Sequence, residues 1–179
     1  LRWCLCYRGI VDFEELTLSS VEKEALKDSL AAYRAGDLIG ALSAYPEDRI
    51  PQSTEERVYR AALWLSLGQV SESERLLGSI GIDPASTAQV DRTARALRRL
   101  IAVVRSEPLK TVVVAPALGS EWLAESYAQQ SERHLEEALA AARRATQQSP
   151  QFGAAWVRLA ELEFGFGHNP EAERALQTA

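Results

Sequence analysis

Apolar and polar residues alternate along most of the chain with the spacing of amphipathic helices, in which one face is buried. Glycines, and polar residues that cap helix N-termini, divide this pattern into short blocks. The blocks predict helices over residues 20–35, 38–45, 54–67, 71–79, 84–106, 120–132, 135–148, 151–166 and 170–178. With few other elements between these helices, the pattern predicts an all-α fold.

A period of 34 residues relates the last two pairs of predicted helices. Trp122 and Trp156 are separated by this distance, and so are the chain's two histidines, His134 and His168. A fixed period of this length is typical of helix-turn-helix units that stack side by side, because one helical hairpin cannot bury its apolar face alone. We therefore predict a solenoid of stacked helical hairpins.

The last unit resembles the tetratricopeptide repeat. Trp156 is followed by Leu159, by the small residue Ala160, and then by Gly167 and Ala172, in the order and spacing of that family. The resemblance implies a right-handed solenoid of tetratricopeptide type. Its layers would be spaced by small residues where helices cross and by tryptophans and leucines between the crossings.

The other units match this pattern less closely. In the unit before the last, Arg133 stands where glycine is usual, and two divergent units in the N-terminal half turn at Gly36 and Gly68. We expect one continuous domain with four parts. They are an extended segment over 1–18, two divergent units over 19–82, a long helix with an extended insertion over 83–118, and two units over 119–179, the last of them truncated.

Two stretches depart from the helical pattern. Residues 1–11 alternate apolar and polar positions with the period of a strand, and the β-prone run inside 108–118 is bounded by prolines. The two stretches pair with each other or lie separately along the helices, and the second arrangement is favoured. Cys4 and Cys6 lie in the first stretch, where two reduced thiols are favoured over a disulfide or a metal site because their spacing suits a bridge poorly.

A further resemblance covers most of the chain, including residues 120–127 and 160–164, and its clearest segments lie in the N-terminal third. The Trp-Cys-Leu segment at residues 3–5, the acidic stretch at 11–16 and the run around Gly36 are similar to the region after a FecR-like domain in bacterial proteins that join it to tetratricopeptide repeats. This similarity implies a scaffold of the cell envelope, extracytoplasmic rather than cytoplasmic. Because the chain starts at Leu1 and stops within the second helix of a repeat, we expect it to be a piece of a longer protein.

Composition argues against several functions. The net charge is −5 and 46% of residues are hydrophobic, but no apolar run approaches the roughly 20 residues that a membrane helix needs. Glycine-rich phosphate loops, nucleophile elbows and metal-ligand spacings do not occur, and His134 and His168 fall at turns between helices. We expect neither an enzyme nor a cofactor.

Arginines form a stripe on the predicted helix 84–106. They are Arg92, Arg95 and Arg99, joined by Arg98 and Arg105. The stripe is either a basic ridge for an acidic partner or a set of solvated side chains on an outer face. We favour solvated side chains, and no nucleic acid partner, because aromatic residues are not interleaved and the chain is acidic.

The resemblance to tetratricopeptide repeats implies a protein or peptide partner, bound along a concave face lined by the first helix of each unit. The positions on this face are Leu26, Leu30, Tyr33 and Arg34, then Val58, Tyr59, Ala62 and Leu65, then Leu123, Tyr127, Gln130 and Ser131, and finally Val157, Arg158, Glu161 and Phe164. We predict that Tyr127, Gln130, Arg158, Glu161 and Phe164 contact the partner.

Two alternatives to this reading stay open. Tyr127 and Phe164 would instead pack against neighbouring repeats, without touching a partner. The chain would alternatively be a structural spacer or a self-association module, with a homodimer formed through the repeat edge near Ala175 and Ala179.

Overall fold

The computed structural model describes residues 9–81, 85–108 and 114–179. These residues form a stack of helices and one short 3₁₀ helix, with no strand among them. The elements are η1 (Phe13–Glu15), α1 (Ser20–Ala25), α2 (Lys27–Arg34), α3 (Leu38–Ser43), α4 (Thr54–Ser66), α5 (Val70–Gly78), α6 (Gln89–Arg105), α7 (Gly119–Ser131), α8 (Leu135–Gln148), α9 (Gly153–Gly165) and α10 (Asn169–Thr178). The predicted all-α solenoid is confirmed.

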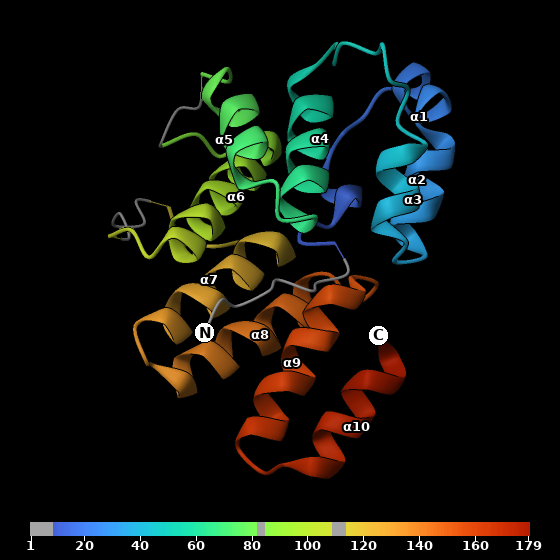
Figure 1. Ribbon diagram of the computed structural model, residues 1–179. Coiled ribbons are helices and arrows are strands. Elements are labelled where there is room, and N and C mark those ends of the chain that lie inside the picture. Colours follow the sequence, from blue (N-terminus) through green and yellow to red (C-terminus); the bar gives the residue numbers. More distant parts are fainter. Residues whose placement is uncertain (1–8, 82–84, 109–113) are drawn as a thin grey trace.

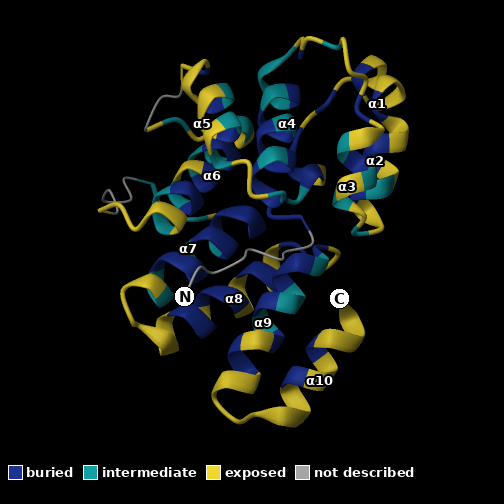
Figure 2. Cartoon of the chain, viewed as in Figure 1, coloured by how far each residue is buried: buried dark blue, intermediate teal, exposed yellow. Residues whose placement is uncertain are grey.

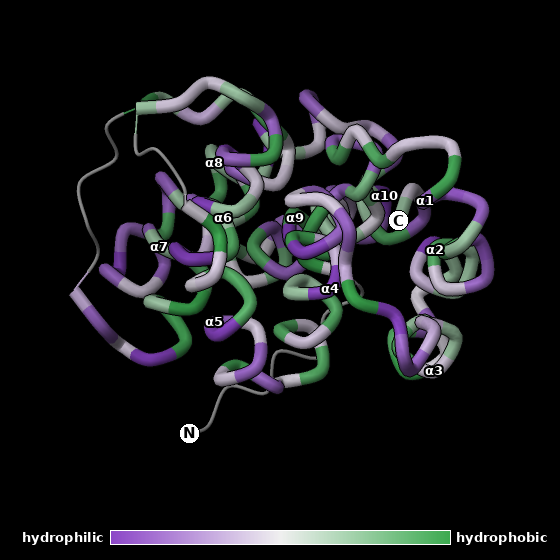
Figure 3. The backbone as a smooth tube through the Cα atoms, turned by 90° about the horizontal axis from the view of Figure 1, so that it is seen from above, coloured by the Kyte–Doolittle hydropathy of each residue, from purple (hydrophilic) through white to green (hydrophobic). Residues whose placement is uncertain are grey.

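The stack consists of antiparallel hairpins. Helices pair as α2 with α3, α4 with α5, α7 with α8, and α9 with α10, and the longer α6 packs against α4, α5 and α7. Figure 1 shows α7 to α10 on one side of the molecule and α1 to α6 on the other. The view from above places α2 and α3 at one flank and α6 and α7 at the other, with α4 and α9 between them (Figure 3).

All of these hairpins turn in the same way. The second residue after the first helix of each hairpin adopts a left-handed backbone, with φ of 76° at Gly36, 76° at Gly68, 69° at Arg133 and 81° at Gly167. The next residue in each case donates its backbone N–H to the carbonyl five positions back, at 2.8 or 2.9 Å. Such a turn satisfies carbonyls that the helix end leaves free. Arg133 therefore occupies the glycine position of the turn, as its place in the period predicted.

The 34-residue period reappears in the helix boundaries. α7 and α9 begin at Gly119 and Gly153, and Trp122 and Trp156 are both half-buried at the fourth position of these helices. The small residues expected at helix crossings are all buried. They are Ala41, Ala61, Ser126, Ala138, Ala160 and Ala172.

Some local predictions need correction. The helix expected over 20–35 is interrupted at Leu26, and α6 begins at Gln89. α5 begins at Val70, one residue before the start predicted at 71, and Gln69 is the residue that precedes it. The stretches 1–8 and 109–113, including Cys4 and Cys6, lie outside the described residues, as does the helix start expected near Pro84.

An extended segment crosses the middle of the stack. Residues 9–18 run between α4 and the α1–α3 group and bring η1 next to α7 (Figure 1). Their apolar side chains belong to the main core: Ile10, Val11, Phe13, Leu16 and Leu18. Burial is greatest where this segment meets the helices, as along α4 and α7, whereas α10 is largely exposed (Figure 2).

Candidate functional site

A shallow hollow of about 370 Å³ opens between the last two hairpins. Its wall comes from the end of α7, the start of α8, and the second half of α9 with the turn that follows. The lining residues are Gln130, Leu135, Arg158, Glu161, Leu162, Gly165 and Phe166. Three of the five predicted contact residues, Gln130, Arg158 and Glu161, thus lie together in one hollow.

Arg158 forms the polar floor of this hollow. Its side chain is almost fully buried, and the guanidinium carbon lies 4.0 Å from the centre of the Tyr127 ring. Nε donates to Ser126 Oγ at 3.0 Å, and Nη2 donates to the Ser126 carbonyl at 3.3 Å and to Gln130 Oε1. A buried arginine needs such partners because an unpaired buried charge is costly. The guanidinium therefore joins α9 to α7 and fixes the shape of the hollow.

Glu161 brings a carboxylate to the rim. Its Oε2 accepts a hydrogen bond from Arg158 Nη1 at 3.3 Å, while 41% of the side chain stays exposed. Partial burial raises the pKa of the Glu161 carboxyl above its usual value, although the neighbouring guanidinium opposes this shift. The exposed carboxylate therefore gains from a hydrogen-bond donor or a positive charge supplied by a partner.

Tyr127 and Phe164 lie outside the lining of the hollow. Tyr127 is buried beneath Arg158, whereas Phe164 is 69% exposed. Phe164 occupies in α9 the position that Gln130 occupies in α7, one period earlier. The aromatic ring that does line the hollow is Phe166, which stacks on the His168 ring at a centroid distance of 6.0 Å. Sequence reasoning missed Phe166 because it falls in the turn, outside the helical positions assigned to the groove.

The predicted groove positions of the first two units do not form an open surface. Except for Arg34, they are buried: Leu26, Leu30, Tyr33, Val58, Tyr59, Ala62 and Leu65. Segment 9–18 belongs to the same core, and its Phe13 ring packs edge-on against Tyr33 at 5.7 Å. Arg34 pairs with Glu14 of that segment at 2.5 Å. The chain itself therefore fills this part of the expected groove.

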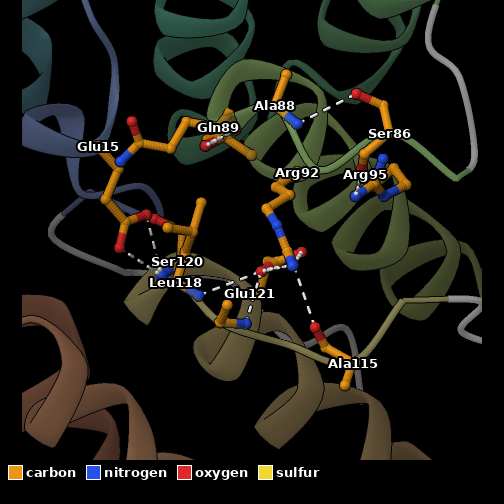
Figure 4. A network of polar contacts seen from close by, with 12 residues as sticks. Glu15, Ser86, Ala88, Gln89, Arg92, Arg95, Ala115, Leu118, Ser120 and Glu121 are labelled. Atoms are coloured by element: carbon orange, nitrogen blue, oxygen red, sulfur yellow. Dashed lines mark hydrogen bonds and ion pairs between the residues drawn. The ribbon is translucent and has the colours of Figure 1, made fainter.

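Arg92 and Arg99 of α6 are not solvated side chains on an outer face, whereas Arg98 and Arg105 are exposed. Arg92 pairs with Glu121 of α7 at 2.9 Å and Arg99 pairs with Glu125 at 2.8 Å, with all four side chains less than one-fifth exposed. Arg98 donates to two backbone carbonyls of the α5 end, and Arg95 and Arg105 also have partners within the chain. Figure 4 shows Arg92 pointing toward Glu121 and Ala115. These side chains attach α6 to its neighbours, which the sequence pattern of one helix could not reveal.

The histidines keep equivalent places in the two hairpins. His134 and His168 precede α8 and α10, and their Nδ1 atoms lie 3.2 Å from Gln129 Oε1 and 2.8 Å from Glu163 Oε2. Each thus contacts the side chain five positions back, within its own turn. In the described part of the chain, no cluster of three or more His, Cys, Asp or Glu side chains has a metal-binding arrangement. None of the described helices combines the length and apolar character of a transmembrane segment.

Stacked hairpins with a side-chain-lined hollow between two of them define a helical solenoid of the kind that binds other proteins. Residues 130–179 match the family model described as tetratricopeptide repeat. The match includes every residue that lines the hollow and supports a protein-interaction scaffold. The family is generally non-catalytic. A comparison with curated proteins gave no match.

Proposed function

We propose that the chain binds an extended segment of a partner protein in the hollow between α7–α8 and α9. An apolar side chain of the partner enters between Leu135 and Phe166, and a basic side chain lies beside Glu161. The observation that carries this proposal is the fixed position of Arg158, because a preorganised polar floor reduces the entropy lost on binding. Tyr127 acts as the support of that floor.

The exposure and charge of the rim support this chemistry. Leu135 is 47% exposed and Phe166 is 37% exposed, so both have apolar area to bury. Acidic residues outnumber basic ones over residues 119–179, which favours approach of a basic partner. Exposed Phe164 extends the contact surface along α9 beyond the hollow.

Selection of peptides from a random library on the full-length chain tests this function. The strongest peptides are then measured against Phe166→Ala and Glu161→Gln by fluorescence anisotropy. We expect each change to weaken binding by about tenfold, equivalent to about 1.4 kcal/mol. Arg75→Ala is the matched control, since Arg75 is an exposed side chain on α5. Equal affinity of all four proteins would refute the assignment of the hollow.

Self-association is the second candidate. Leu176 on α10 is 58% exposed, although the position one period earlier, Ala142, is fully buried under α9. A second copy would cover this face as α9 covers the face of α8. Light scattering over a concentration series tests this candidate, and Leu176→Glu is expected to abolish any dimer. The predicted edge residue Ala175 is itself buried, so it cannot be the main contact.

The proposed place of action is the bacterial cell envelope. This part of the proposal is supported by the resemblance to FecR-linked repeat regions alone. Fractionation of cells that carry a tagged full-length protein tests it, with recovery from the extracytoplasmic fraction as the expected result. Recovery in the cytoplasm would refute it.

A further inference from the structure

Residues 9–18 form an extended segment that backbone hydrogen bonds and buried side chains hold against the helices. Val11 is held through its backbone, because its N–H donates to Tyr33 Oη at 3.2 Å and its carbonyl accepts from the same hydroxyl at 2.8 Å. The next N–H, that of Asp12, donates to Ser120 Oγ at 2.9 Å. These bonds join the segment to α2 at one place and to α7 at another.

The apolar side chains of the segment are part of the main core. Ile10 and Val11 are 1% exposed, and the Phe13 ring lies between Tyr33 and the Arg34 guanidinium, whose carbon is 4.5 Å from the ring centre. Gly9 has a left-handed backbone with φ of 57°, and a Cβ there would lie 2.6 Å from the Tyr33 ring. The surface is therefore shaped for this segment.

Glu15 anchors the segment at the N-terminal end of α7. Its Oε1 accepts hydrogen bonds from the Gly119 N–H at 2.6 Å and from Ser149 Oγ at 2.9 Å. Its Oε2 lies 3.3 Å from the Ser120 nitrogen, and Figure 4 shows the Glu15 carboxylate directed toward Ser120. Carboxylates are favoured at this end of a helix. Burial nevertheless raises the pKa of both Glu15 and Asp12 above their usual values, so the ionised segment is held at a desolvation cost.

We propose that residues 9–18 are an internal ligand, and that a partner displaces them by offering an extended segment of the same chemistry. That chemistry is a pair of apolar residues, an aromatic residue two positions on, and a carboxylate two positions after that, as in Val11, Phe13 and Glu15. The surface then exposed consists of Tyr33, the adjoining face of α6, and the N-terminal end of α7. This surface is separate from the hollow at Arg158 and does not depend on its function.

Few backbone hydrogen bonds join the segment to the helices, and its buried carboxyls carry a desolvation cost, so we expect its release to need less free energy than global unfolding. A receptor that is open for only a fraction of the time binds a competing ligand with an affinity reduced by that fraction. Weakening the internal segment alone should therefore strengthen binding of the same peptide added from outside.

The experiment uses a labelled peptide of residues 9–18 and the full-length chain. The double variant Val11→Ala, Phe13→Ala weakens the internal segment and leaves its receptor surface unchanged. Arg75→Ala is the control, because Arg75 is exposed on α5 and does not touch the segment. We expect the double variant to bind the peptide at least about tenfold more tightly than the wild type or the control. A peptide with Glu15→Lys should bind the double variant at least about tenfold more weakly.

A folded double variant that binds no peptide overturns the proposal. Hydrogen exchange of the wild-type chain decides the matter if that variant does not fold. Amides of residues 9–18 are expected to exchange together and faster than those of α4, through release of the segment. If the amides of residues 9–18 and of α4 exchange only through global unfolding, the segment is an inseparable part of the core. That result would also overturn the proposal.

Discussion

The carboxylate of Glu15 accepts a hydrogen bond of 2.6 Å from the backbone N–H of Gly119, which lies 104 residues further along the chain. This contact joins the extended N-terminal segment to the first helix of the last two hairpins. It therefore connects the divergent half of the solenoid to the regular half, at a point where both are buried.

Removal of this carboxylate should destabilise the whole stack. Glu15→Ala leaves the N–H groups of Gly119 and Ser120 and the hydroxyl of Ser149 buried without this acceptor. We expect a loss of about 1–3 kcal/mol in the free energy of unfolding. Chemical denaturation measures it, with exposed Glu14→Ala as a control that changes stability by under about 1 kcal/mol. Similar effects of both changes would contradict the anchoring role.

Replacement of Arg133 by glycine should stabilise the protein. Arg133 has φ of 69°, a conformation that costs a residue with a side chain roughly 1 kcal/mol relative to glycine. Gly68→Ala is the converse change, and a Cβ at Gly68 meets no atom within 4 Å, so only the backbone conformation matters. We expect shifts of about 1 kcal/mol in opposite directions in denaturation experiments. Shifts of the same sign would contradict the shared turn geometry.

Glu56 should make the protein sensitive to acid. Its carboxylate is fully buried, and burial alone would raise its pKa, but hydrogen bonds from Arg49, the Gln52 N–H and Tyr45 lower the pKa below the usual 4.5. The stabilisation by this carboxylate is therefore complete above about pH 4.5 and is lost as the pH falls through the lowered pKa. The stability difference between wild type and Glu56→Gln, about 2 kcal/mol at pH 7, should shrink below pH 4.5. A difference that stays constant down to pH 3 would contradict the linkage.

The arginines of α6 should matter for stability. Arg92→Ala leaves the buried Glu121 carboxylate without its ion pair to α6, and we expect a loss of about 2–4 kcal/mol. Arg75→Ala removes an exposed pair within α5 and should cost under about 0.5 kcal/mol. Thermal or chemical denaturation compares the two. An Arg92→Ala variant with unchanged stability would instead support the interpretation of these arginines as solvated side chains.

Local signals predicted the helices and turns well. Gly36, Gly68 and Gly167 mark hairpin turns through their own backbone preference. Ser19 and Ser53 cap α1 and α4, each with a glutamate three residues further on, which is a local signal of a helix start. The repeat period then placed Arg133 in a turn despite its unfavourable residue type.

Long-range pairings could not be predicted in the same way. Nothing local at Glu15 indicates that its partner is Gly119, and the apolar residues of segment 9–18 show no helical spacing that would assign them to the core. From the sequence of α6 alone, its arginine stripe looks like a solvent-exposed face, because the partners Glu121 and Glu125 lie on α7. The repeat pattern predicted three residues of the hollow: Gln130, Arg158 and Glu161. It did not predict Phe166, because that residue lines the hollow through the geometry of the turn after α9.

Backbone NMR during titration of a library-selected peptide into the full-length chain tests the central claim most directly. We predict the largest chemical-shift changes at Gln130, Leu135, Glu161, Gly165 and Phe166, which line the hollow. Amides of α3, at the far end of the stack, should stay unchanged. Saturable binding with its largest changes away from the hollow, on α3 or α5, would contradict a binding site between the last two hairpins.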